Sequence, residues 1–479
     1  MSSGVHGMQS YDVVIVGAGP AGCTSALAFA RASKRVLLLE ADPRASDRLA
    51  GEWLHPPAVA ILDRLGVDLT PATPYATGKG FVIFPCDGSE PIALPYAAGT
   101  SGLAIEHTLL VETLRAHCER DELIDLVPWA RATRIDGQSL TFERRSAASR
   151  TSTTRTVSAP LIVGASGRSA PPAGRTTEPR SAASSRMAGI VLDGTTSQTR
   201  AALPFEGYLH VFLGGPGPVM AYRIDARRVR VLCDVPLSLP IPRDGGIALY
   251  EAYASVIPAE MRDAFRAALA PRAAGTSASP DARLHWASID LRPRVDLGRE
   301  GLALIGDAVG AHHPLAATDL TLAIEDAETL AKSPSFASYA RTRARAARVP
   351  EMLAVGLYEV FADDADEVVA IRRAIYELWR EKPSERLKSM GFLSGEDRSH
   401  LRFGTSFLRT MLRGSRDFVR DAVRTGRVIH TGRVASDLGQ RMAWLFGGTL
   451  HLTEALPASV QQRIRAPRTA EGRYGAALR

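Results

Sequence analysis

Four short apolar runs along the chain predict buried parallel strands. Residues 13–16, 36–39, 160–163 and 302–305 consist largely of Val, Ile, Leu and Ala and lack the alternation of a half-exposed strand. A helical segment that continues to Arg31 separates the first two runs. Strands that alternate with helices in this way are typical of an α/β fold with a parallel sheet.

A second set of strand-like runs occupies the middle of the chain. Residues 187–192, 208–213, 219–224 and 229–235 are separated by turns rich in Gly and Pro. Residues 80–84 and 92–94 flank a further turn and predict a hairpin that reaches toward this second sheet. Beyond Arg341 the pattern is mostly helical.

A glycine-rich turn, with Gly17, Gly19 and Gly22, directly follows the first apolar run. Gly17 suits a tight turn, Gly19 lets the backbone approach a pyrophosphate, and Gly22 lets the next helix pack closely on the strand. The N–H groups and the positive dipole end of that helix then face the phosphates. Glu40 ends the second run 23 residues after Gly17, close to the ~20 residues expected for the acid that binds an adenosine ribose. The pattern predicts a dinucleotide site.

Composition agrees with an ordinary globular protein of two or three domains, with 479 residues of which 45% are apolar. The first ten residues lack an apolar signal region, and no apolar run approaches the ~18 residues that would span a bilayer. A reducing cytoplasm is the simplest compartment, because the cysteines form neither a metal-binding nor a disulfide pattern. They are Cys23, Cys86, Cys118 and Cys233.

The net charge of +7 comes from the C-terminal part of the chain, where 21 Lys and Arg face 10 Asp and Glu from Arg372 onward. Attraction to anionic lipid and an Arg-rich solvated surface both remain open. Residues 442–452 are the most apolar part of this tail and could lie in a membrane interface or pack on another domain. Nucleic-acid binding is disfavoured, because no recognition motif is present. His312 and His313 do not indicate a metal site, because adjacent side chains point apart.

Three separated stretches resemble the FAD-dependent single-component monooxygenases, most closely the squalene epoxidase branch. They are the turn at residues 17–22 with Glu40, residues 47–56 (DRLAGEWLHP), and residues 306–315 (GDAVGAHHPL) continuing to Thr321 and Asp326. Residues 80–83 and 94–96 fit in order and spacing. The likeness covers about residues 11–345.

The resemblance implies roles for particular residues. Asp307 would hydrogen-bond the ribityl chain of FAD, backbone from Pro314 to Thr318 would line the isoalloxazine, and His107 stands in the slot usually filled by an Arg. Ser166 replaces the acid of the family's D-G fingerprint, and residues 316–319 replace a glycine-rich turn. The candidate catalytic residues are His55, where the family has Gln, and Phe81, where it has Tyr. The candidate cofactor-binding residues are Gly17, Gly19, Pro20, Ala21, Gly22, Glu40, His107, Gly306, Asp307, Pro314, Ala317 and Thr318.

The resemblance also implies a reaction. FAD would be reduced by NADH or NADPH, which docks transiently, and would react with O2 to give a C4a-hydroperoxide that donates one oxygen atom. The favoured substrate is a double bond in a hydrophobic isoprenoid, prenylated aromatic or polyketide-type compound of secondary metabolism. The alternatives are hydroxylation of an electron-rich aromatic ring, a flavin reductase like the geranylgeranyl reductases, and a nonenzymatic flavin-binding protein. The partners expected are this substrate, O2 and a peripheral membrane surface, with no nucleic acid.

The fold expected from these features is α/β, with a Rossmann-like FAD-binding domain, an inserted β-sheet substrate domain and a helical C-terminal region. Residues 11–175 and 291–345 would form the FAD-binding domain, with the hairpin at 80–96 extending to the substrate domain. Residues 176–290 would form the substrate domain, and residues 346–479 the basic helical region.

Overall fold

A six-stranded sheet, mostly parallel, forms the first part of the molecule, in the order β18-β19-β12-β1-β2-β8. The computed structural model describes residues 10–424 apart from 45–48, 70–76, 146–150, 169–184, 271–282, 293 and 295. Strand β1 lies between β2 and β12, with Val14 opposite both Leu37 and Ile162, so the apolar runs seen in the sequence are its buried centre. The strands are β1 (Val13–Val16), β2 (Val36–Glu40), β8 (Ile124–Pro128), β12 (Leu161–Gly164), β18 (Gly298–Arg299) and β19 (Leu302–Leu304).

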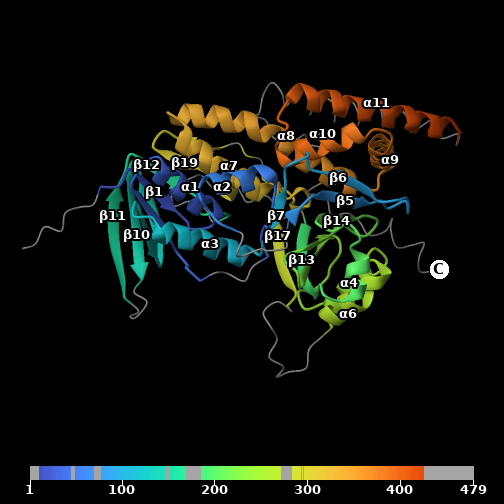
Figure 1. The fold of residues 1–479 in the computed structure, drawn as a ribbon, viewed down its shortest axis with the longest axis horizontal. Coiled ribbons are helices and arrows are strands. Elements are labelled where there is room, and N and C mark those ends of the chain that lie inside the picture. The colour runs from blue at the N-terminus through green and yellow to red at the C-terminus, as the bar shows by residue number, and fades with distance from the viewer. Residues whose placement is uncertain are drawn as a thin grey trace, which may run out of the picture.

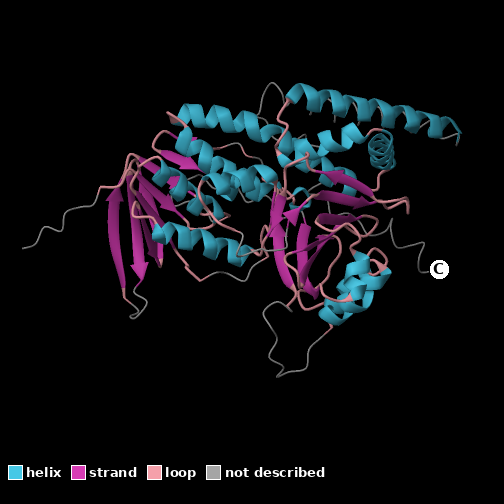
Figure 2. Ribbon diagram, viewed as in Figure 1, coloured by secondary structure: helices cyan, strands magenta, loops and turns pink. Residues whose placement is uncertain are grey.

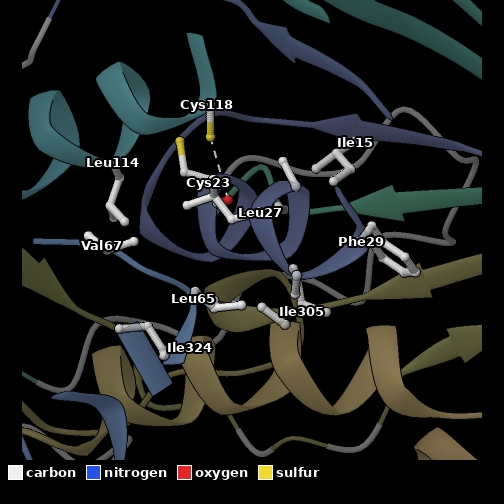
Figure 3. Close-up of a cluster of buried hydrophobic side chains, with 14 of the residues drawn as sticks. Ile15, Cys23, Leu27, Phe29, Leu65, Val67, Leu114, Cys118, Ile305 and Ile324 are labelled. Carbon is white, nitrogen blue, oxygen red and sulfur yellow. Dashed lines mark hydrogen bonds between the residues drawn. The ribbon is translucent and has the colours of Figure 1, made fainter. Parts of the chain in front are cut away.

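Helices cover one face of this sheet and a small sheet covers the other. An apolar core lies between the sheet and these helices, and Figure 3 shows Leu27 and Phe29 of α1 in it with Ile305 and with Ile324 of α7. On the opposite face, β9 (Ala130–Asp136), β10 (Ser139–Arg145) and β11 (Ser152–Ser158) form an antiparallel sheet, seen at the left of Figure 1. The covering helices are α1 (Pro20–Arg31), α2 (Pro56–Arg64), α3 (His107–Arg120) and α7 (Thr318–Lys332).

A seven-stranded sheet forms the second part of the molecule, in the order β17-β13-β16-β15-β14-β5-β6. Strand β5 comes from early in the chain and pairs in parallel with β14, with Gly80 opposite Tyr208. All other pairs in this sheet are antiparallel. The strands are β5 (Gly80–Phe84), β6 (Ile92–Pro95), β13 (Ser185–Asp193), β14 (Tyr208–Phe212), β15 (Val219–Arg223), β16 (Arg228–Pro236) and β17 (His285–Ile289).

The two faces of the second sheet pack against different helices, as Figures 1 and 2 show. One face packs on α4 (Ser197–Ala202), α5 (Gly246–Tyr253), η1 (Ala259–Met261) and α6 (Arg262–Leu269), with Tyr253 and Phe265 fully buried between them. The other face packs on the C-terminal helices. A third small sheet of β3 (Trp53–Leu54), β7 (Gly102–Ala104) and β4 (Thr77–Gly78) lies where the two large sheets approach each other.

Four helices make up the described C-terminal region: α8 (Phe336–Ala362), α9 (Asp366–Glu381), α10 (Pro383–Ser394) and α11 (His400–Arg424). Helix α11 is the outermost and packs on α9 (Figure 1). Within the described part of the chain, no helix combines the length and the apolar character needed to cross a bilayer. The apolar segment at residues 442–452 lies outside the described residues, as do Asp47 and Arg48 of the second motif.

Candidate functional site

The three glycines of the first turn each meet a different steric demand. Gly17 has a φ of +104°, and a Cβ there would lie 2.6 Å from the carbonyl oxygen of Ala165. A Cβ at Gly22 would lie only 1.8 Å from the carbonyl oxygen of Gly17. A Cβ at Gly19 would meet nothing within 4 Å, so the backbone there borders open space. The turn is therefore closed by Gly17 and Gly22 and open at Gly19.

The N-terminus of α1 has no side chain that caps it. Gly19 is the N-cap residue, Pro20 opens the helix, and the first turn contains no acidic residue. The first N–H groups of a helix have no partner within the helix, so those of Ala21 and Gly22 can face a ligand. Such an end suits an anion.

Glu40 lies beside the same turn and is held in place. Its Oε2 accepts the N–H of Ala18 at 2.8 Å and lies 3.0 Å from a guanidinium nitrogen of Arg115. Arg115 also donates to the carbonyl oxygens of Ala18 and Pro43. Arg115, which lies on the same helix as His107, was not identified from the sequence.

His107 lies at the start of α3 and contacts a different segment. Its Nδ1 lies 3.1 Å from the carbonyl oxygen of Gly51, so the imidazole bonds the backbone just before Trp53 and His55. The cation that contacts the Gly17 turn and Glu40 in the structure is Arg115, eight residues further along α3 than the Arg slot would place it.

The late turn at Gly306 and Asp307 packs directly on the first turn. Gly306 has a φ of +61°, and a Cβ there would lie 3.1 Å from the Cβ of Ala21. Arg292 donates to the carbonyl oxygen of Asp307 at 2.7 Å. Asp326 accepts the N–H of Gly306 at 2.9 Å. The two turns that the sequence connects to one cofactor therefore lie side by side.

The Asp307 carboxylate is partly exposed and lies beside the guanidinium of Arg168. Its side chain is 32% exposed and lies 3.5 Å from Nε of Arg168. Its pKa is raised by burial and by the neighbouring charge of Asp319, against the opposing effect of Arg168. Segment 164–167, which precedes Arg168, borders the first turn through Ala165, whose N–H donates to the carbonyl oxygen of Val16. Asp307 thus borders the space next to the first turn.

The loop at residues 312–317 leads from the late turn into α7. Pro314 opens the short helix η4 (Pro314–Ala316), and Ala317 then takes a left-handed conformation with a φ of +52°. Thr318 begins α7 and is buried, and its hydroxyl has no hydrogen-bond partner among the described residues. His312 is fixed by Asp319, whose carboxylate accepts both its backbone N–H and its Nδ1 proton.

A chain of hydrogen bonds joins His55 to this loop. Trp53 Nε1 donates to the hydroxyl of Tyr96 at 2.8 Å, and that hydroxyl lies 2.7 Å from Nδ1 of His55. Nε2 of His55 lies 3.0 Å from the carbonyl oxygen of Ala316, which can only accept. The network therefore assigns the His55 proton to Nε2. Burial lowers the pKa of His55 to about 4, so the ring is neutral at neutral pH.

Phe81 completes this arrangement. Its ring stacks on that of His55 with centroids 5.7 Å apart and meets Trp53 edge to face at 5.9 Å. His55 is the N-cap residue of α2, and Phe81 lies on β5. The structure thus brings together the two candidate catalytic residues of the sequence analysis.

An apolar cluster extends from Phe81 across the second sheet to the C-terminal helices. Its residues come from strands of the sheet, from the loop at 312–317 and from α8, α9 and α10, so it joins all three parts at one place. Members include Phe81, Ile83, Leu94, Leu209, Met220, Leu232, Leu315, Ala316, Ala354, Phe361, Trp379 and Leu393.

These residues fit FAD. Open space at Gly19 and uncapped amides at the start of α1 suit a pyrophosphate. The carboxylates of Glu40 and Asp307 suit sugar and ribityl hydroxyls, because ionised carboxylates accept hydrogen bonds. The unpartnered hydroxyl of Thr318, at the end of the loop, offers one further polar group.

Two family models match the chain. The Squalene epoxidase model matches residues 182–416, and the FAD dependent oxidoreductase model matches residues 12–76. Together they cover the first turn with Glu40, most of the second sheet, the late turn and the C-terminal helices.

Curated relatives agree with these models. Squalene epoxidase erg1 of Aspergillus fumigatus is 28% identical over 398 residues, which cover 76% of this chain and 78% of the relative. Squalene monooxygenase of Rattus norvegicus is 24% identical over 390 residues, and the chain spans 64% of the length of that relative.

Solved structures share the fold. The flavin-dependent brominase Bmp2 aligns with a TM-score of 0.65 at 15% identity, covering 87% of this chain and 100% of its own. The probable FAD-dependent monooxygenase pqsL of Pseudomonas aeruginosa aligns with a TM-score of 0.56 at 17% identity, covering 74% and 97%. The fold class predicted from the sequence is confirmed.

Proposed function

We propose that this chain, an FAD-dependent monooxygenase of the squalene epoxidase-like branch, adds one oxygen atom from O2 to a carbon–carbon double bond of a hydrophobic substrate. The observation that carries the proposal is the contact between the apolar cluster and the loop at residues 312–317. Leu315 and Ala316 of that loop belong to the same cluster as Phe81. An apolar substrate held there would lie against the side of the site that adjoins the FAD-binding residues.

FAD is the cofactor, and residues of both turns would hold it. Backbone amides of the first turn, from Gly17 to Gly22, would bind the pyrophosphate, Glu40 the adenosine ribose, and Asp307 the ribityl chain. When bound, FAD supplies electrons from NADH or NADPH and the activation of O2. The backbone of residues 314–318 would border the flavin ring.

The protein's own contribution is to orient the substrate and keep water out. Phe81 is 2% exposed and is proposed to contact the substrate, together with apolar side chains of the second sheet and of α8 to α10. Few polar groups interrupt this lining, so the reacting double bond would be shielded from bulk solvent. Orientation of the double bond toward the flavin side would then set which carbon atoms react.

His55 is proposed as a positioning residue and not as a proton donor. Its ring is neutral at neutral pH, and its single proton is engaged by the carbonyl oxygen of Ala316. By holding that carbonyl, His55 fixes the residue before Ala317, whose left-handed conformation shapes the loop. Trp53 and Tyr96 in turn fix His55, so the loop geometry depends on the whole hydrogen-bonded chain.

The test is to supply the FAD-loaded protein with NADH or NADPH, O2 and a panel of polyprenyl hydrocarbons, polyprenyl alcohols and prenylated phenols. The expected product carries one added oxygen atom at a double bond, with the label recovered from ¹⁸O2. Addition to the aromatic ring would instead identify a hydroxylase. Saturation of a double bond without O2 would identify a reductase. Consumption of reductant with release of H2O2 and no oxygenated product from any member would overturn the proposal.

We also propose that the outer surface of α11 contacts a membrane from which such a substrate is collected. Leu401 and Leu412 are 78% and 62% exposed on a helix that also carries the exposed Arg402 and Arg409. Apolar and basic side chains together suit an anionic lipid surface. Co-sedimentation with vesicles that contain phosphatidylserine, lost in Leu401→Asp with Leu412→Asp, is expected. Equal sedimentation of the double variant would contradict this proposal.

A further inference from the structure

A buried acid and a buried histidine face each other at the edge of the apolar cluster. Asp234 of β16 is fully buried, and His313, from the loop at residues 312–317, is 2% exposed. Nε2 of His313 lies 3.1 Å from Oδ1 of Asp234. Neither group belongs to the cofactor-binding residues discussed above, and neither has a role in the proposed function so far.

The protonation of His313 follows from its other nitrogen. Nδ1 accepts the N–H of Leu315 at 3.2 Å, so a neutral ring carries its proton on Nε2. Tyr358 of α8 stacks on the imidazole with centroids 3.9 Å apart and an interplanar angle of 16°. The stacking and the bond to Leu315 together fix the plane of the ring.

In that plane the Nε2–H does not align with the carboxylate. Although the two atoms are close, Nε2 of His313 and both carboxylate oxygens of Asp234 lack a hydrogen-bond partner among the described residues. An unsatisfied donor and an unsatisfied acceptor thus lie side by side. Each such buried group without a partner lowers the free energy of unfolding by about 1–3 kcal/mol. A polar ligand group that pairs with both would remove this cost.

The pair faces the proposed substrate region. Asp234 is directly opposite Met187 in the sheet, and side chains opposite each other share a face. Met187 belongs to the apolar cluster, as does Leu232, two residues before Asp234. Ser185, two residues before Met187, is on the same face and also has a buried hydroxyl without a partner among the described residues. Three unpartnered polar side chains therefore gather on one wall of an otherwise apolar region.

The chemistry of the pair favours a ligand group that both accepts and donates a hydrogen bond. A carbonyl group could accept from Nε2 but could not donate to the carboxylate. An ammonium group could donate to the carboxylate but could not accept from Nε2. A hydroxyl group does both, because its oxygen accepts while its proton is donated.

We propose that His313 and Asp234 bind a hydroxyl group of the substrate, with Ser185 beside them. This inference rests on the proposed function and narrows it to hydrophobic compounds that carry an alcohol or phenol hydroxyl. The hydroxyl would anchor one end of the molecule, and the apolar cluster would hold the chain that bears the double bond.

The experiment compares ligands that differ only in that hydroxyl. Farnesol, the hydrocarbon lacking its hydroxyl, and a farnesylated phenol are titrated into the oxidised, FAD-loaded enzyme, and binding is followed by the change in flavin absorbance. We expect the hydroxylated ligands to bind about tenfold more tightly, the effect of one well-placed hydrogen-bonding group. In Asp234→Asn the preference is expected to fall to about twofold or less, with the affinity for the hydrocarbon unchanged.

The matched control is Asp193→Asn, which changes an exposed acid at the far end of β13 and is expected to leave the preference intact. Ser185→Ala is a second, milder test in which the preference is expected to fall by a smaller factor. Equal binding of alcohol and hydrocarbon by the wild-type enzyme, binding of neither, or an undiminished preference in Asp234→Asn would overturn the inference. Because binding is measured without turnover, a hydroxyl preference with no oxygenated product would contradict only the proposed reaction.

Discussion

Asp326 accepts the backbone N–H of Gly306 at 2.9 Å, although the two residues lie on different elements and 20 residues apart. The other oxygen of the same carboxylate accepts the Nε–H of Arg343 at 2.6 Å, and Arg294 donates to the oxygen that also accepts from Gly306. Arg343 is 1% exposed and reaches Glu325 as well. A buried group of charges therefore holds the turn that presents Asp307.

Replacing Asp326 should loosen that turn and destabilise the fold. Asp326→Asn leaves the guanidinium of Arg343 with one fewer charged partner in a buried site, and we expect a loss of about 3–5 kcal/mol in the free energy of unfolding. Urea unfolding and retention of FAD after gel filtration measure the two effects. Asp136→Asn, which breaks an exposed pair with Arg134, should cost less than about 1 kcal/mol. Equal stability of the two variants would contradict this account.

The first turn offers two alanine substitutions with separable outcomes. Gly19 has a φ of −82° and open space around it, so Gly19→Ala should fold normally while its methyl group meets the approaching pyrophosphate. We expect FAD affinity to fall about tenfold or more with stability within about 1 kcal/mol of wild type. In Gly22→Ala the methyl group overlaps the carbonyl of Gly17, so both stability and FAD binding should be lost. Calorimetric FAD titration with thermal melting of each apoprotein distinguishes the two. Normal FAD affinity in Gly19→Ala would contradict the placement.

His55→Phe tests the hydrogen-bonded chain to the loop. Phenylalanine has a similar shape but leaves the carbonyl oxygen of Ala316 without its donor and the hydroxyl proton of Tyr96 without its acceptor. We expect a loss of about 2 kcal/mol in stability, a shifted flavin spectrum and more reductant consumed for each product molecule formed. His55→Gln restores an amide donor and should therefore recover part of the yield of product per molecule of reductant. A His55→Phe enzyme that forms one product molecule for each reductant molecule would show that the loop does not depend on the hydrogen bond from His55 to Ala316.

Two buried histidines should make the protein acid-sensitive. Burial lowers the pKa of both His55 and His210 to about 4 from the ordinary value of 6.5. The unfolded chain therefore binds protons first as the pH falls, so stability is complete above about pH 6.5 and is lost between pH 6.5 and 4, by about 3 kcal/mol for each residue. Unfolding midpoints in urea across this range measure the loss. His210→Phe should reduce the slope of the free energy of unfolding against pH. An unchanged slope would contradict the lowered pKa of His210.

Ala317 offers a stabilising substitution at the cofactor loop. Its left-handed conformation is unfavourable for a residue with a Cβ and natural for glycine. We expect Ala317→Gly to raise the free energy of unfolding by about 0.5–1 kcal/mol. Thermal melting of the apoprotein is the measurement, with Ala316→Gly, at a residue without positive φ, as the control that should not gain stability. A less stable Ala317→Gly would indicate that the methyl group makes compensating contacts.

The features that could be predicted from the sequence are local ones. Gly17 directly follows β1, Gly22 lies in the first turn of α1, and Glu40 ends β2, so short-range spacing is sufficient to identify them. The same is true of the buried strands, and the predicted fold class is confirmed for this reason.

Features that depend on contacts between distant segments could not be predicted. The hydrogen bond from His55 to Ala316 joins residues 261 positions apart, and no local pattern encodes it. Arg115 of α3 contacts Glu40 of β2, which is 75 residues away in the chain. Asp234 contacts His313 only because β16 and the loop at residues 312–317 lie next to each other in the fold. Sequence spacing identified His107 on α3, but the direction of each side chain on that helix depends on how the helix packs.

The pairing of β5 with β14 has a consequence for how this protein is made. Residues 85–207 must be synthesised before β5 can pair with β14, and β12 likewise cannot pair with β19 until residues 165–301 have been made. During translation both sheets present open edges, which are sites of misassociation for nascent chains. A recombinant fragment cut at 176–290 would keep such an edge permanently, so expression of the uninterrupted polypeptide is the sound route to soluble material.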